Sequence, residues 1–129
     1  TLLFLQTNKE KTKTLVIKYD IKSKAIDKVH IFDGTNYALF QFLSKNRALL
    51  VKRGSGIPFI LDLKTGVAKD INLDKIYWIK ISPDEKKMTY LRIRETSFDL
   101  YISDIDGSNV EKIEVEDNID IVAPQWFIE

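Results

Sequence analysis

The chain has 129 residues, of which 44% are hydrophobic and 30% are charged, as in ordinary soluble globular domains. Twenty basic and nineteen acidic residues leave a net charge of +1, which gives no electrostatic basis for binding nucleic acid or an anionic membrane. The absence of cysteine excludes disulfides and thiolate metal sites. No apolar run approaches the ~20 residues of a spanning helix, so we expect no membrane insertion. Because the chain begins at Thr1, we expect it to be a piece of something longer.

Short β-branched and aromatic runs separated by turn signals predict strands along most of the chain. In the first part, residues 1–6, 14–21 and 26–32 are expected to be strands, with a charged loop at 8–13. His30 lies in the third of these strands and has no nearby carboxylate or second histidine in sequence, so we interpret it as structural. Residues 36–43, 48–52, 57–63 and 67–71 predict four more strands.

The stretch from Lys80 to Ile113 gives the clearest pattern. Ser82-Pro83-Asp84 is a turn signal because Pro fixes φ and the flanking side chains can accept backbone N–H groups. Residues 88–93 and 98–104 read as strands, and Asp106-Gly107 predicts a tight turn before a last strand near 110–115. This unit is a small antiparallel meander.

The same plan recurs at a fixed interval. Asp20, Asp62 and Asp104 each end a strand and precede a turn, and successive members are 42 residues apart. Val29 and Ile71 keep the same interval. Repeats of about 40 to 45 residues with four strands each are typical of propeller blades.

A sequence motif supports this interpretation. The run ISPDEKKMTYL, then DLYISDIDGSNVEKI, closing on Ala123-Pro124-Gln125-Trp126, resembles the repeat of TolB-like β-propellers. Ile81 replaces the usual Trp, Glu85 replaces the turn glycine, and Phe127 follows Trp126 where the repeat has Ser. The resemblance implies an all-β fold of antiparallel four-stranded meander sheets arranged as propeller blades, incomplete or part of a larger propeller. We expect a single propeller-like domain over 1–129, with blades near 1–35, 36–75 and 76–118 and the next blade beginning at 119–129.

Three blades pose a physical problem, because propellers close with about four to eight blades and an open strand edge invites pairing. Three solutions remain: further blades from a longer chain, several copies completing a ring, or another packing of the sheets.

Catalytic and metal sites are not predicted. A single histidine and no nucleophile elbow exclude a Ser-His-Asp set. Asp104, Asp106 and Asn109 could be calcium ligands, but the pattern of a calcium loop is incomplete and we favour a turn. The glycines of the 53–56 loop lack the following helix of a phosphate site, so a hairpin turn is favoured there too. Large aromatic residues, among them Trp78 and Trp126, are expected to fill space between blades.

We therefore expect a non-catalytic binding or scaffold module that recognises a protein, peptide or glycan and uses no cofactor. The alternatives are a propeller segment of a larger hydrolase, such as a prolyl-oligopeptidase-type peptidase, and a self-assembling structural domain. The resemblance implies a location outside the cytoplasmic membrane. The candidate binding residues lie in three strand-end loops: Lys45, Asn46 and Arg47; Arg53, Gly54, Ser55 and Gly56; and Glu95, Thr96, Ser97 and Phe98.

Overall fold

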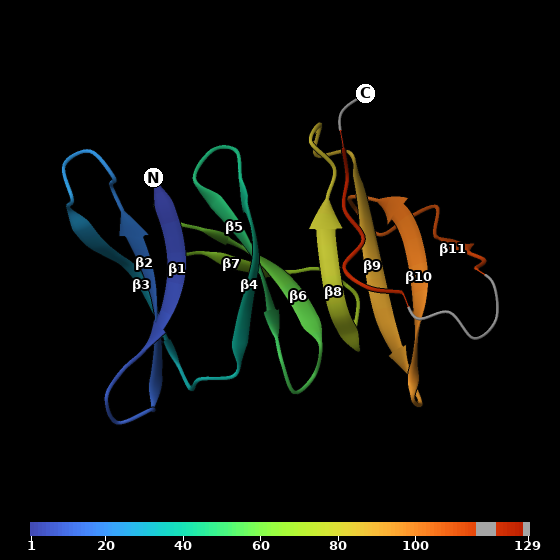
Figure 1. Ribbon diagram of the computed structural model, residues 1–129, viewed down its shortest axis with the longest axis horizontal. Helices are drawn as coiled ribbons and strands as arrows, with labels where there is room; N and C mark the ends of the chain where they lie inside the picture. The colour runs from blue at the N-terminus through green and yellow to red at the C-terminus, as the bar shows by residue number, and fades with distance from the viewer. Residues whose placement is uncertain (116–120, 128–129) are drawn as a thin grey trace. The chain divides into compact units, whose positions relative to one another are not determined.

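The computed structural model describes residues 1–115 and 121–127 and shows an all-β chain (Figure 1). These residues contain eleven strands, β1 to β11, in three antiparallel sheets, which confirms the predicted fold class. The described part of the chain has no helix that could cross a membrane. Alternation of apolar and polar residues, with β-branched and aromatic side chains, explains why these segments form strands.

The first sheet has three strands: β1 (Leu2–Thr7), β2 (Lys13–Tyr19) and β3 (Ile26–Asp33). The register of β1 on β2 is regular and runs from Leu2 opposite Tyr19 to Thr7 opposite Thr14. The pairing of β2 with β3 shifts at Val16 and Ile17. The sequence led us to expect four strands in each sheet, and this sheet has one fewer among the described residues.

The second sheet has the expected four strands in sequence order. They are β4 (Tyr37–Leu43), β5 (Arg47–Lys52), β6 (Ile57–Asp62) and the short β7 (Ala68–Asp70). Five of the six residues of β6 are apolar, and the central residues of β5 are fully buried, as expected for strands enclosed on both faces.

The chain forms two compact units, residues 1–54 with 59–69, and residues 55–58 with 70–129. The first unit has a continuous core in which Val16 of the first sheet packs with Leu50, Phe59 and Leu61 of the second. Phe32, Tyr37 and Phe59 extend this core as a cluster of stacked and edge-on rings. Burial of these large apolar groups is the main term that stabilises the unit.

The second unit contains the third sheet, with strands β8 (Ile76–Ile81), β9 (Lys87–Arg94), β10 (Ser97–Asp104) and β11 (Glu111–Ile113). Tyr90 and Met88 of β9 and Ile79 of β8 are completely buried. The Tyr90 ring stacks on Tyr101 of β10 at 5.4 Å.

The start of another blade was expected at residues 119–129. Residues 121–127 form no strand, and residues 119, 120, 128 and 129 lie outside the described residues. Instead, two indoles attach this segment to β8. Trp78 Nε1 donates to the Pro124 carbonyl at 3.1 Å, and Trp126 Nε1 donates to the Lys80 carbonyl at 3.2 Å. Pro124 lacks an N–H group, which weakens any ladder that the segment could form.

Asp20, Asp62 and Asp104, which are spaced 42 residues apart, each begin a similar backbone turn. The Asp20 and Asp62 backbone N–H groups donate five residues ahead, to Ala25 and Val67, and each carbonyl accepts from the fourth residue, Lys24 or Gly66. Both of these fourth residues have positive φ. The Asp104 turn is one residue tighter, because its N–H donates to Ser108 and its carbonyl accepts from Gly107. The interval of 42 residues therefore corresponds to a repeated structural unit.

Candidate functional site

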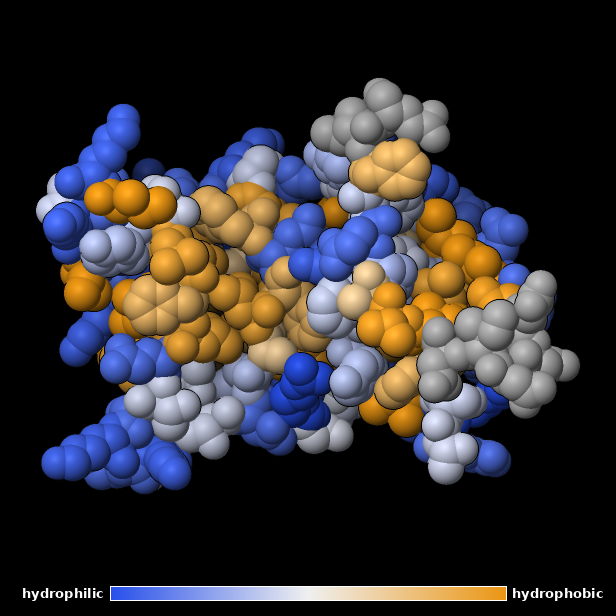
Figure 2. Space-filling model, viewed as in Figure 1, coloured by the Kyte–Doolittle hydropathy of each residue, from blue (hydrophilic) through white to orange (hydrophobic). Residues whose placement is uncertain are grey.

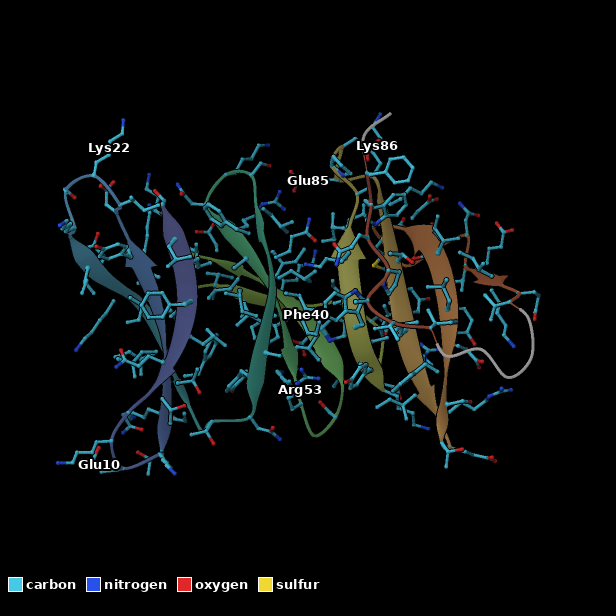
Figure 3. All side chains as sticks on the ribbon, viewed as in Figure 1. Glu10, Lys22, Phe40, Arg53, Glu85 and Lys86 are labelled. Atoms are coloured by element: carbon cyan, nitrogen blue, oxygen red, sulfur yellow. The ribbon has the colours of Figure 1, made fainter. Side chains whose placement is uncertain are left out.

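The two candidate loops next to β5 do not form one site. In an antiparallel meander, consecutive turns lie at opposite ends of the strands. The turn at Lys45 and Asn46 joins β4 to β5, and the loop at 53–56 leaves the other end of β5. Figure 3 shows the two ends in the first unit, with Glu10 and Arg53 toward one end and Lys22 toward the other.

One end of the first unit carries a connected set of loops, which we call the loop surface (residues 8–12, 33–36 and 53–54). Gly34 N donates to the Thr12 carbonyl at 2.7 Å, and Arg53 N donates to the Asn36 carbonyl at 2.8 Å. These two bonds link the β1–β2 loop, the β3–β4 connection and the start of the β5–β6 loop. Sequence reasoning identified only the last of these as a candidate, and predicted a charged loop at 8–13 without making it a candidate site.

Side chains further fix the loop surface. Asn8 Oδ1 accepts from the backbone N–H groups of Thr12 and Lys13, both at 2.8 Å, which closes the β1–β2 loop. Lys13 Nζ pairs with Asp33 Oδ1 at 2.8 Å, and this hydrogen bond and charge hold the Asp33 pKa below its ordinary value. Since both groups are exposed, the pair orders the surface more than it stabilises the fold.

Arg53 contributes a cation–aromatic contact to the loop surface. Its guanidinium carbon lies 5.7 Å from the centre of the Phe40 ring. A guanidinium is planar and carries five N–H donors, a geometry that suits recognition of carboxylate groups. Arg53, Gly54 and Ser55 are exposed, so the first three residues of this candidate loop are accessible.

Gly56 has a different role from its three neighbours. It is buried, with φ of +69°, and Lys75 N and Ile76 N donate to the Ser55 and Gly56 carbonyls at 3.0 Å. A β-carbon at Gly56 would lie 2.5 Å from Ile76 N and 2.6 Å from the Lys75 α-carbon. The glycine therefore permits a close approach of two backbones.

The Lys45–Arg47 candidate is a turn at the opposite end. Lys45 and Asn46 have φ of 57° and 54°, a left-handed conformation that asparagine tolerates better than lysine. Asn46 O accepts from Leu63 N at 2.8 Å, which ties this turn to the end of β6. Arg47 is already part of β5, and its Nε donates to the Ser44 carbonyl.

The Glu95–Phe98 candidate lies in the second unit as a two-residue turn between β9 and β10. Glu95 has φ of 50°, and Ser97 and Phe98 already belong to β10. The Phe98 ring stacks on Tyr77 at 4.6 Å. Next to the turn, Asp99 lies between Arg94 at 3.4 Å and Lys112 at 3.8 Å. The exposed part of this candidate is therefore Glu95, Thr96 and Ser97.

The residues considered for metal binding or catalysis have structural contacts. His30 packs edge-on against Phe32 at 4.5 Å and lies next to Gly66, where a β-carbon would be 3.2 Å from His30 Nδ1. Asp104 accepts from Lys87 of β9 and from Asn109, and Asp106 accepts from Ser108 within the turn. Within residues 1–115 and 121–127, no group of three His, Asp or Glu side chains is placed to hold a metal ion.

Several aspartates have lowered pKa values because they accept hydrogen bonds within turns, and these shifts do not indicate a reactive centre. Hydrogen bonds from Ser23 lower the pKa of Asp20, and backbone N–H groups of Thr65 and Lys64 lower that of Asp62. The Ser82 hydroxyl, followed by Lys86 N, lowers the pKa of Asp84. Hydrogen bonds to a carboxylate favour its charged form, so these groups are stable anions in the turns.

Comparison with known proteins identifies the fold. No family model matches the chain, and no curated protein matches it. Among solved structures, TolB from Acinetobacter baumannii aligns with a TM-score of 0.63 and 16% identity, over 85% of this chain and 28% of TolB. The acylaminoacyl peptidase of Pyrococcus horikoshii aligns with a TM-score of 0.55 and 12% identity, over 86% of this chain and 22% of the peptidase. The β-propeller domain of the Trilobed protease from Pyrococcus furiosus gives a TM-score of 0.37 at 16% identity, with 88% and 28% covered.

The three meander sheets and the likenesses to TolB and acylaminoacyl peptidase define the fold class: the chain has an unclosed β-propeller fold with three blade-like sheets. The fold is TolB-like, as the sequence motif predicted. The chain spans about a quarter of the solved chains that it matches.

Proposed function

We propose that the chain is a non-catalytic binding module in which the loop surface recognises a protein, peptide or glycan partner. The observation that supports this most is the pair of backbone hydrogen bonds that joins three loops on one rigid scaffold. Loops fixed in advance lose little conformational entropy on binding, which favours affinity. Arg53, Lys9 and Glu10 supply exposed charges of both signs for polar contacts.

The proposal can be tested with matched loop variants. Arg53→Ser together with Lys11→Ser alters the loop surface, while Lys22→Ser with Lys24→Ser removes the same charge from the β2–β3 turn at the opposite end. Labelled chain is applied to a glycan array and used to capture binding partners, which are then identified by mass spectrometry. The proposal predicts specific ligands that the first variant loses and the second keeps. Equal retention by both variants would refute a role for the loop surface.

The likeness to acylaminoacyl peptidase, of which the alignment covers 22%, suggests a second candidate function. In this alternative the chain is the propeller segment that accompanies a hydrolase domain in a longer protein. Sequencing the complete reading frame tests it, because a G-x-S-x-G nucleophile elbow outside these residues is required.

We further propose an extracytoplasmic location, as the TolB-like repeat implies, and cell fractionation with an antibody tests it. Recovery with cytoplasmic markers would contradict this location. Self-assembly, the remaining alternative, predicts an apparent mass that rises with concentration in light scattering.

A further inference from the structure

The β2–β3 and β6–β7 turns of the first unit present a lysine at the same place. Residues 20–25 read DIKSKA, and residues 62–67 read DLKTGV. In each turn the aspartate accepts a backbone N–H group from the residue three places ahead, and the third residue is an exposed lysine, Lys22 or Lys64. The related turn of the third sheet has Asp106 at this position. A turn of this kind therefore does not require a lysine for its backbone structure.

The candidate turn at Lys45 adjoins the turn of Lys64. The backbone N–H of Leu63 donates to the Asn46 carbonyl at 2.8 Å, which joins the β4–β5 turn to the β6–β7 turn. Figure 1 shows the β2–β3 and β4–β5 turns at the same end of the first unit, and Figure 3 shows Lys22 at this end. We call these three turns the basic turn surface (residues 20–25, 44–47 and 62–67).

The basic turn surface concentrates positive charge. It contains five cations and two carboxylates, a net charge of +3, whereas the whole chain has a net charge of +1. Both carboxylates belong to partly buried residues and accept hydrogen bonds within their own turns. Four of the cations are exposed and form no ion pair with another residue in the described part of the chain: Lys22, Lys24, Lys45 and Lys64. Their ammonium groups can therefore contact a ligand.

An acidic polypeptide segment fits this surface best. Clusters of cations recognise acidic motifs, and turns fixed by backbone hydrogen bonds hold several cations within reach of one extended segment. Val67 is 65% exposed three residues after Lys64, which favours a partner with apolar as well as acidic side chains. Nucleic acids and anionic membranes bind best to strongly positive molecules, and a net charge of +1 does not provide such a field.

We propose that the basic turn surface binds an acidic polypeptide segment through its four exposed lysines. This site lies at the opposite end of the strands from the loop surface and is independent of it. It gives the Lys45 turn, which the loop surface does not include, a role of its own.

A pair of peptides tests the proposal. The probe is a fluorescein-labelled peptide that repeats Glu-Glu-Leu, and its control repeats Gln-Gln-Leu. Binding to the chain is measured by fluorescence anisotropy at low and at physiological ionic strength. We expect saturable binding of the acidic peptide alone, weaker at the higher ionic strength because salt screens exposed charges.

Double variants locate the site. Lys45→Ser with Lys64→Ser should weaken binding of the acidic peptide about tenfold, because two exposed charge contacts are lost. Lys22→Ser with Lys24→Ser should weaken it as well. The matched control, Lys75→Ser with Lys86→Ser, removes two exposed lysines from the second unit and should change binding less than about twofold. Urea denaturation verifies that each variant folds.

Three results would overturn the proposal: no saturable binding, equal binding of the uncharged peptide, or an equal loss in the control variant. Tighter lysine-dependent binding of single-stranded DNA or of phosphatidylglycerol vesicles would also overturn it, and would assign the surface to a nucleic acid or a membrane. Loss of this peptide leaves the proposed role of the loop surface intact, because that role is tested by Arg53→Ser with Lys11→Ser.

Discussion

Gly56 provides the sharpest test of the packing around the β5–β6 loop. In Gly56→Ala, the new β-carbon would lie 2.5 to 2.7 Å from three backbone atoms of Lys75 and Ile76. Backbone atoms cannot rotate away, and moving them would stretch the bonds from Lys75 N and Ile76 N to the Ser55 and Gly56 carbonyls. The steric overlap should cost about 1–3 kcal/mol, and the left-handed φ about 1–2 kcal/mol more.

The expected total of about 2–5 kcal/mol is a large part of the free energy of unfolding of an ordinary domain, about 5–15 kcal/mol. Gly34→Ala is the matched control, because Gly34 has φ of +82° and no atom within 4 Å of its built β-carbon. It should lose only the conformational term, about 1–2 kcal/mol. Urea denaturation at one pH measures both variants, and equal losses would refute the close backbone approach.

Three further predictions concern single side chains. Tyr90→Phe should raise the free energy of unfolding by about 1 kcal/mol, since the buried Tyr90 hydroxyl makes no hydrogen bond of ordinary geometry with the described residues, although the Ser103 side chain lies near enough to lower the Tyr90 pKa against the effect of burial. A loss of stability in urea would contradict this. Ser82→Ala should lower the free energy of unfolding by about 1–3 kcal/mol, because the buried Ser82 hydroxyl accepts from Lys87 N and donates to the Asp84 carboxylate. An unchanged denaturation midpoint would contradict this. Hydrogen bonds lower the Asp62 pKa in the folded chain, so they stabilise the fold above about pH 4. This stabilisation is lost as the pH falls through the pKa of Asp62 in the folded chain. Asp62→Asn should therefore flatten the fall of stability between about pH 5 and pH 3, and an unaltered pH profile would exclude this role.

The fold was largely predictable because local chemistry and the repeat agree. Strand and turn preferences identify the meander near Lys80 to Ile113, and the interval between Asp20, Asp62 and Asp104 extends it to the earlier sheets. The expectation of four strands was wrong for the first sheet among the described residues. A repeat interval shows which residues of successive sheets correspond, but it does not show that one sheet has fewer strands. The blade expected to begin at 119–129 has no strand in its described part, residues 121–127; hydrogen bonds from the Trp78 and Trp126 indoles attach this segment to β8 instead.

The candidate site was less predictable, because a loop's sequence does not reveal which other loops lie beside it. Arg53 was identified from its loop, but its link to Asn36 and the link of Gly34 to Thr12 are tertiary contacts. The sequence predicted that Gly56 is part of an ordinary turn. A residue without a β-carbon is required there because Lys75 and Ile76, about twenty residues later in the chain, lie too close. The basic turn surface became visible only once the turns of the first two sheets could be compared in the structure.

Hydrogen exchange of the free chain tests the repeated-sheet account most directly. Strands β5 and β9 have neighbours on both sides, so all their amides that enter the ladders should exchange slowly. In β1 only the alternate amides that face β2 should be protected, and the others should exchange rapidly. Uniform protection along β1 in the monomeric chain, or rapid exchange in β5 or β9, would contradict the account.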